Sequence, residues 1–441
     1  MRMLVMILLL IRQKLQCGNP MEKEKEKEKK VIAARGMVLS VTGRLVISSA
    51  FTLPEVVSML SRLRSLDLSF SRFSGQIPSE LLALSKLVFL DLSGNPMLQL
   101  QKPGLRNMET SPLEMLHLAG TSFSGELPTS IWRLGSLTNL DISSCNFQLL
   151  DNGLSLLSYT KFKFLELDAC NLTKIPDFLQ KQDELKLLSL SNNKIHGPIP
   201  KWIWNISKET LEYLDLSGNF LIGFDQPPVV LPWSKLKSLN LDSNMLQGPL
   251  PIPPPSTSEY LVFGNKLIGE ISPLICNMSS LMLLDLSSNN LSGRIPQCLA
   301  NFNKSLFVLD LGNNRLDGPI PQTCTMPNNL RVIDLGENQF QGQIPRSFAN
   351  CMMLEHLVLG NNQIDDIFPF WLGALPQLQV LILRSNRFHT QGASFAEPWW
   401  QQSYWPYPIL PGKPNTTGVI GSFPKQALRQ DPLATNKDDI P

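Results

Sequence analysis

The apolar residues of this chain recur in one short pattern. Leu66-Asp67-Leu68-Ser69 returns at 90–93, 214–217 and 284–287. In Leu-x-Leu the two leucines point to one side of a short strand, and the residue between them points to the other. The residue five places after the first leucine can be aligned fourteen times, at intervals of 21 to 26 residues: Ser71, Asn95, Thr121, Cys145, Cys170, Asn193, Asn219, Asn244, Asn265, Asn289, Asn314, Asn338, Asn362 and Asn386. The pattern therefore predicts about fourteen repeats of about 24 residues, each with one short strand.

Repeats of this kind predict an α/β solenoid with a parallel sheet on its concave side. Each coil can bury its leucines only against its neighbours, so the stack is stable as a whole. The recurrent Asn has a donor and an acceptor, and at the turn out of the strand it can satisfy backbone groups of adjacent coils. Cys145 and Cys170 are compact enough to occupy the same slot. In the second half of a repeat, as in 316–321, Gly permits a turn, Ile fills the core and Pro precedes a short helical return.

These residues carry a family resemblance. The unit Leu-x-x-Leu-x-Leu-x-x-Asn-x-Leu-x-Gly-x-Ile-Pro, over residues 63–389, resembles the plant-specific leucine-rich repeat, which forms a right-handed superhelix. Residues 361–369, 371–372 and 381–388 are similar to plant receptor-like proteins of the Cf and Verticillium-resistance type. The resemblance implies an extracellular repeat domain, a membrane anchor, a short tail without a kinase, and signalling through a partner receptor kinase.

The two ends of the chain depart from that family. Its members begin with paired Cys around a Trp, whereas residues 1–62 contain only Cys17 and no Trp. Beyond Asn386 the repeats give way to a Pro-rich tail instead of further repeats and an anchor. We therefore expect a signal-like segment with a charged linker at 1–36, a degenerate flank at 37–62, the repeat domain at 63–389 and a tail at 390–441. On this view the family pattern is truncated at both ends.

The composition argues against some classes of function but does not identify one. The net charge is +2, with 17% charged residues, which favours neither a nucleic-acid binder nor an acidic disordered chain. The longest apolar run, 4–11, is too short to span a bilayer as a helix but fits the core of a secretory signal. Residues 22–30 alternate Glu and Lys, as in a solvated spacer.

The chain shows no pattern typical of an enzyme. His117, His196, His356 and His389 lie in separate repeats, away from any nucleophile signature. Phosphate-binding loops, kinase motifs and zinc-like Cys spacing are missing from the sequence, so we expect no metal and no cofactor.

Two kinds of covalent modification fit a secreted protein. Cys276 and Cys298 lie 22 residues apart on the return segments of adjacent coils, where they could pair or remain free thiols. The sequence also contains six glycosylation acceptors of the form Asn-x-Ser/Thr, at Asn171, Asn205, Asn277, Asn290, Asn303 and Asn415.

The concave face is the expected binding surface. The residue between the two leucines is acidic in eight coils, which fits a ligand of mixed charge or is simply the habit of this repeat class. Five coils place a base just after the aligned slot, at Arg72, Lys194, Lys266, Arg315 and Arg387. A few outward positions depart from this acidic pattern and carry aromatic, apolar or basic residues instead. Aromatic residues and Arg are enriched in binding hot spots. The resulting candidates for ligand contact are Tyr213, Phe220, Phe263, Arg315, His356, Val358, Ile382, Arg384 and Arg387.

By this resemblance the chain is a non-enzymatic recognition module of a cell-surface or extracellular protein. It would bind a peptide, a microbial protein or a cell-wall fragment in defence or development. Two alternatives remain open at this point. One is a secreted inhibitor of microbial cell-wall-degrading enzymes, and the other is a cytoplasmic scaffold.

Overall fold

The computed structural model describes residues 38–40, 62–77, 81, 84–100, 111–126, 131, 134–148, 160–226, 229–301, 305–322, 324, 329–389 and 418–420. These residues divide into two compact units. The first comprises residues up to 228 together with 232–239, and the second comprises 229–231 together with residues from 240 onward. The signal-like segment and most of the flank and tail lie outside the described residues, so those boundaries stay predictions.

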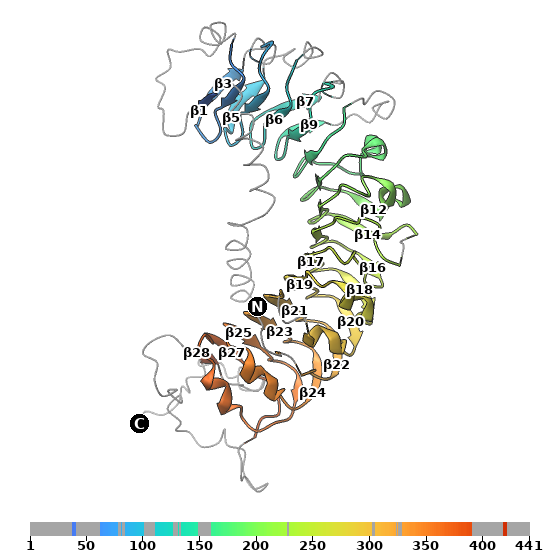
Figure 1. Cartoon of the computed structure of the whole chain (residues 1–441), viewed down its shortest axis with the longest axis vertical. Helices are drawn as coiled ribbons and strands as arrows, with labels where there is room; N and C mark the ends of the chain where they lie inside the picture. Colours follow the sequence, from blue (N-terminus) through green and yellow to red (C-terminus); the bar gives the residue numbers. More distant parts are fainter. Residues whose placement is uncertain are drawn as a thin grey trace, which may run out of the picture. The chain divides into compact units, whose positions relative to one another are not determined.

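The first unit is built on a parallel sheet with one strand from each coil (Figure 1). Its strands are β2 (Ser65–Asp67), β4 (Phe89–Asp91), β6 (Met115–His117), β8 (Asn139–Asp141), β10 (Phe164–Glu166), β11 (Leu187–Ser189) and β13 (Tyr213–Asp215). Neighbouring strands pair in register, so that the central leucines form one buried column. The strand β1 (Val38–Ser40) pairs with β2, and β15 (Ser238–Asn240) lies at the boundary between the units.

The second unit repeats this arrangement. Its strands are β17 (Glu259–Leu261), β19 (Leu283–Asp285), β21 (Val308–Asp310), β23 (Val332–Asp334), β25 (His356–Val358) and β27 (Val380–Ile382), with β28 (Gly418–Ile420) pairing with β27. These strands are also parallel and in register. A strand therefore stands at each of the fourteen predicted positions, and the predicted solenoid is confirmed.

The second half of each coil forms a further layer of short elements. In the first unit β3 (Ser74–Ile77) pairs with β5 (Met97–Leu100), β7 (Ser124–Glu126) with β9 (Asn146–Gln148), and β12 (His196–Ile199) with β14 (Phe220–Phe224). In the second unit the "second sheet" has the order β16 (Gln247–Gly248), β18 (Lys266–Gly269), β20 (Asn290–Gly293), β22 (Arg315–Pro319), β24 (Gln339–Gly342) and β26 (Gln363–Ile364).

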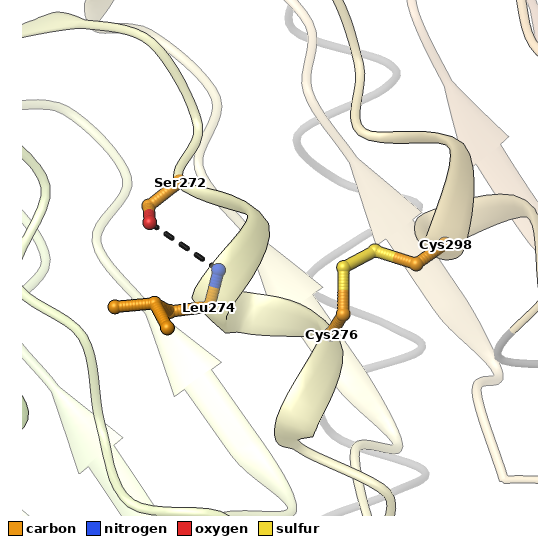
Figure 2. Close-up of a disulfide and its surroundings, with 4 residues drawn as sticks. All are labelled: Ser272, Leu274, Cys276 and Cys298. Carbon is orange, nitrogen blue, oxygen red and sulfur yellow. Dashed lines mark hydrogen bonds between the residues drawn. A yellow bond between two sulfur atoms is a disulfide. The ribbon is translucent and has the colours of Figure 1, made fainter.

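The helical returns are short 3-10 helices of five residues each. They are η2 (Asp177–Lys181), η3 (Lys201–Asn205), η4 (Pro273–Asn277), η5 (Gln297–Asn301), η6 (Arg346–Asn350) and η7 (Phe370–Ala374). Pro comes directly before most of them, because its fixed φ suits a helix start. At η4 the Pro is the first helical residue, and the Ser272 hydroxyl accepts a bond from the Leu274 N–H at 3.3 Å (Figure 2).

The recurrent Asn side chains tie successive coils together. Asn314 is typical: its Nδ2 donates to the carbonyls of Leu286, Leu311 and Gly312 at 3.0 to 3.3 Å, and its Oδ1 accepts the Leu291 N–H at 3.0 Å. These bonds join one coil to the preceding one and satisfy buried backbone groups in both. Cys145 fills the same slot as a free thiol and donates to the Leu118 carbonyl at 3.1 Å.

The residue before each of these slots turns the chain from the long parallel sheet into the second layer. All fourteen such residues have positive φ, between 49° and 68°. They are Phe70, Gly94, Gly120, Ser144, Ala169, Asn192, Gly218, Ser243, Gly264, Ser288, Asn313, Glu337, Asn361 and Ser385. At Gly218 an added Cβ would lie 2.6 Å from Asn192 Oδ1, so a larger residue there would require the Asn192 side chain to move.

Candidate functional site

The candidate site is the outward, concave face of the long parallel sheet, considered separately in each unit. In the strands of this sheet from β2 to β27 the central residue is buried in the core, so the first and third residues point to the opposite face. We call the first residues of the strands the "first row" and the third residues the "second row". Because the strands pair in register, each row runs directly across adjacent coils.

The aspartates of the second row form hydrogen bonds to their own backbone. Asp67 accepts the Ser69 N–H at 3.0 Å, Asp310 accepts the Gly312 N–H at 3.0 Å, and Asp334 accepts the Gly336 N–H at 2.8 Å. The same bond, from the amide two residues further along, is made by Asp91, Asp141, Asp215 and Asp285. This local role explains the recurrence of Asp between the leucines. Sequence reasoning missed it, although a Ser or Gly two residues after the Asp was the available signal.

Three of these carboxylates are stacked inside the second unit. Asp285, Asp310 and Asp334 are buried and lie opposite one another on β19, β21 and β23. Burial raises the pKa of Asp334 to about 7, since the surrounding protein replaces the water that would stabilise its charge. Asp334 therefore changes charge close to neutral pH.

In the first unit the first row contains a packed apolar cluster. Phe164, Leu187 and Tyr213 lie side by side on β10, β11 and β13. The Lys186 ammonium lies 5.9 Å from the Phe164 ring centre, and the Lys237 ammonium lies 5.8 Å from that of Tyr213. Tyr213 is on the predicted face, but only 6% of it is exposed because its neighbours and Lys237 cover it. Its part in ligand contact stays a prediction.

In the second unit the last coils carry a different surface. His356 and Val358 occupy the two rows on β25, and Val380 and Ile382 occupy them on β27. Arg384 follows β27 and is exposed, and the half-buried Phe263 follows β17. Here the structure brings four of the predicted residues together: His356, Val358, Ile382 and Arg384.

Three other predicted residues lie elsewhere. Phe220, Arg315 and Arg387 each come directly after the aligned Asn, beyond the turn with positive φ, so the chain has already entered the second layer. Phe220 opens β14 and is 52% exposed, Arg315 opens β22, and the Arg387 N–H donates to the Ile364 carbonyl of β26 at 2.8 Å. The structure thus places them at the start of the second layer, beside the strands of the concave face, and their part in ligand contact stays a prediction.

Two disulfides join adjacent coils of the second unit. Cys276 of η4 is bonded to Cys298 of η5, with Cα atoms 5.7 Å apart (Figure 2). Cys324 is bonded to Cys351, with Cα atoms 5.4 Å apart. Sequence reasoning missed the second pair, although its separation of 27 residues is also close to one repeat.

The glycosylation acceptors differ in exposure. Asn171, Asn205 and Asn277 are exposed, and the last two end η3 and η4. Asn290 is half-buried in β20, between two paired strands. Asn303 and Asn415 lie outside the described residues, as does Cys17.

Metal-binding clusters and membrane-spanning helices are absent from the residues that the structure describes. No three His, Cys, Asp or Glu side chains there are grouped to hold a metal ion. His117 lies 3.5 Å from Asp91 on β4, and His389 lies 3.5 Å from Asp365. None of the helices in these ranges is long and apolar enough to cross a bilayer.

Comparison with known proteins agrees with this architecture. Family models described as leucine rich repeats match residues 62–84, 184–206, 280–302, 305–326 and 328–388. The chain therefore contains leucine-rich repeats in both units. Its resemblance to the plant receptor-like proteins is also confirmed: receptor-like protein 7 of Arabidopsis thaliana is 44% identical over 140 residues. That match covers 32% of this leucine-rich-repeat chain and 14% of the relative, so the chain spans a small part of the relative's length.

Solved structures show the same fold. The leucine-rich-repeat ectodomain of the Arabidopsis thaliana membrane receptor kinase GASSHO1/SCHENGEN3, in complex with CASPARIAN STRIP INTEGRITY FACTOR 2, is 33% identical with a TM-score of 0.65. The similarity covers 76% of this chain and 43% of that one. A TDR receptor is 26% identical with a TM-score of 0.60, covering 74% and 65% of the two chains.

Proposed function

We propose that this leucine-rich-repeat chain recognises an extended peptide on the concave face of its second unit, as the ligand-binding part of a cell-surface receptor-like protein. The proposal rests on one observation above all. On β25 and β27 the acidic second row is replaced by Val358 and Ile382. Val358 is 7% exposed and Ile382 is half-buried, and both lie on the outward face near the exposed Arg384. As apolar side chains they cannot accept the backbone N–H that Asp accepts in the other coils.

The relatives favour this reading over an enzyme. A GASSHO1/SCHENGEN3 ectodomain of similar fold is bound to a named factor, and the matched relatives are receptor-like proteins. The wider activity that we propose follows from that resemblance: signalling in defence or development through a partner receptor kinase. A bound microbial protein or cell-wall fragment is the alternative ligand, and inhibition of a cell-wall-degrading enzyme is the alternative activity.

An oxidising, extracellular setting is part of the proposal. The two inter-coil disulfides favour it, because such bonds are rare in reducing compartments. The exposed acceptors Asn171, Asn205 and Asn277 are accessible to carry N-glycans. Peptide mapping of the full chain from plant cells, before and after removal of N-glycans, tests this. Free thiols at all four paired Cys and unmodified Asn at all three positions would contradict it.

The binding experiment uses the disulfide-bonded full chain and a bead-displayed library of N-acetylated, C-amidated octapeptides. Binders are then measured in solution by fluorescence anisotropy. Val358→Asp should abolish binding, because it places a charge beside the apolar side chains of Val380 and Ile382. The matched control is Gln341→Asp, which puts the same charge on the exposed surface of β24 and should leave the Kd unchanged. Equal binding by both variants, or no binder from the library, would refute a peptide site here.

A further inference from the structure

Most coils supply an acceptor for one backbone N–H at the end of the concave strand. We call this N–H, which belongs to the residue two places after the second-row residue, the "turn amide". In seven coils the second-row Asp of the same strand accepts it, and in an eighth Asn240 accepts it at 3.2 Å. Because these side chains lie on the outward face, the amides that they bond are directed to that face.

Two coils without this acceptor receive one from the coil before them. Leu261 of β17 cannot accept a hydrogen bond, and the Phe263 N–H is bonded instead by the Asp242 carboxylate of the preceding coil at 2.7 Å. The Ser191 N–H is bonded in the same way by Asp168 at 2.7 Å. An apolar side chain in the second row therefore leaves the turn amide accessible to a carboxylate from elsewhere.

The last coil has neither kind of acceptor. Ile382 stands in its second row, and Gly360 stands where the preceding coil would supply an aspartate. The Arg384 N–H consequently has no hydrogen-bond acceptor among the described residues. The Arg384 carbonyl accepts the Asn361 N–H at 2.8 Å and Ser385 has φ of 57°, as the equivalent residues do in the other coils. The end of this strand therefore has the same geometry, with the acceptor missing.

The same lack occurs one coil earlier, but there the amide is covered. Val358 precedes the Gly360 N–H, which is likewise not bonded to any acceptor in the described part of the chain. A Cβ added at Gly360 would lie 3.1 Å from Ile382 Cγ2 and 3.3 Å from Arg384 Cγ, so these two side chains lie over Gly360. Gly360 is buried, whereas Arg384 is exposed. Of the two residues, Arg384 is the one that a ligand can reach.

From this arrangement we infer that the Arg384 N–H and guanidinium bind the carboxylate of an Asp or Glu side chain in the peptide. The inference rests on the proposed function and names the ligand group that the site selects. The ligand carboxylate takes the role that the chain's own aspartate has in the other coils. The guanidinium adds a charged donor that the aspartate-containing coils lack at this position, and hydrogen bonds between charged groups are stronger than those between neutral groups.

The charges near Arg384 favour an anionic ligand. Arg384 has no ion-pair partner within the described ranges, and Arg387 of the same coil is also exposed. Along the second row the nearest acidic residue is Asp334 on β23, two strands away, which is about 10 Å at the usual strand spacing. Asp365 lies 3.5 Å from His389 and is paired with it. An incoming carboxylate therefore meets an unneutralised cation.

The test measures the preference of the protein for a carboxylate over the isosteric amide. The peptides come from the same N-acetylated, C-amidated library, so Asp and Glu side chains supply their only carboxylates. Wild type should bind the best acidic peptide about ten- to hundredfold more tightly than its Asn or Gln counterpart, the range expected for a hydrogen bond to a charged group. A ratio of one, or a set of binders without acidic residues, would overturn the inference.

Ile382→Asp is the decisive variant, because it restores the acceptor that the repeat normally carries. Its carboxylate should bond the Arg384 N–H, so the ratio of the two Kd values should fall to about one while the melting temperature stays equal or rises. The matched control is Gln341→Asp, which adds the same charge on β24 and should keep the wild-type ratio. An unchanged ratio in Ile382→Asp, or an equal fall in both variants, would contradict the assignment.

Arg384→Met separates the two donors and does not depend on how well Ile382→Asp folds. It removes the guanidinium from an exposed position and keeps the N–H. The ratio should fall but stay above one. An unchanged ratio would exclude Arg384 as the carboxylate site, and a ratio of one would show that the N–H contributes nothing.

The results separate the inference from the proposed function. If Val358→Asp abolishes binding while wild type binds acidic and amide peptides equally, the peptide site stands and the role of Arg384 is overturned. If Val358→Asp binds normally, or if no peptide binds, the proposed site fails and the inference fails with it.

Discussion

Replacement of Asp334 by Asn should stabilise the second unit and remove much of its sensitivity to pH. Asp334 is 4% exposed and lies in the same row as the buried carboxyls of Asp285 and Asp310. Its pKa is raised from 3.8 to about 7. The folded chain therefore binds this proton more tightly than the unfolded chain does. The resulting stabilisation is fully present below about pH 4 and is lost as the pH rises through about 7.

The structure gives the magnitude and the reason to choose Asn. A shift of about three pKa units corresponds to about 4 kcal/mol at pH 8, falling toward zero at pH 4. Asparagine keeps the local turn, because Asn240 at the equivalent position of β15 accepts the Asp242 N–H through Oδ1 at 3.2 Å. The substitution thus removes the charge and retains the acceptor.

Urea unfolding at pH 4, 6 and 8 measures the effect. The midpoint for Asp334→Asn should exceed that of wild type by an amount that grows with pH. The control is Asp67→Asn on β2, whose carboxylate makes the same bond to the backbone but is half-buried. A variant less stable than wild type at pH 8, or a gain that does not depend on pH, would refute the reasoning.

Three further outcomes follow from the inter-coil contacts. Asn314→Ala should lower the free energy of unfolding by about 2 to 4 kcal/mol, because it removes four bonds to buried backbone groups. The neighbouring variant Asn313→Gly should not destabilise the protein, and urea unfolding of the two variants checks the difference. Glu337→Gly should stabilise by about 1 kcal/mol, since Glu337 has φ of 56°, and an unchanged melting temperature would contradict this. The double variant Cys324→Ser/Cys351→Ser should have a free energy of unfolding about 3 to 4 kcal/mol lower than that of wild type, the loop-closure value for 27 residues. Urea unfolding of both proteins under non-reducing conditions measures the difference.

The strands and their register could be predicted from the sequence because their cause is local and repeated. Leu-x-Leu fixes which side of a strand is buried, and one slot per coil fixes how coils align. The same pattern does not show where the chain leaves the sheet. The positive φ at Asn313, for example, sends Arg315 into the second sheet, and a propensity argument at one residue is too weak to reveal that turn.

The candidate site was predictable only in part, since its decisive features depend on contacts between coils. Val358 and Ile382 could be recognised because they replace an acidic residue within a repeated pattern. The covering of Tyr213 by Lys237, and the bond from the Phe263 N–H to Asp242, depend on side-chain positions in neighbouring coils. Those positions are set by packing, which sequence spacing does not specify.

The bonds made by the recurrent Asn side chains have a consequence for how such a chain can change over generations. At Asn314, Asn338 and Asn362, for example, the side chain contacts its own coil and the one before it, and it bonds to equivalent backbone groups each time. Duplicating or deleting one whole coil would restore an equivalent set of bonds at the new junction. Unequal recombination between repeats could therefore lengthen, shorten or shuffle the outward rows while the fold persists. New combinations of surface residues could then arise without an intermediate sequence that fails to fold.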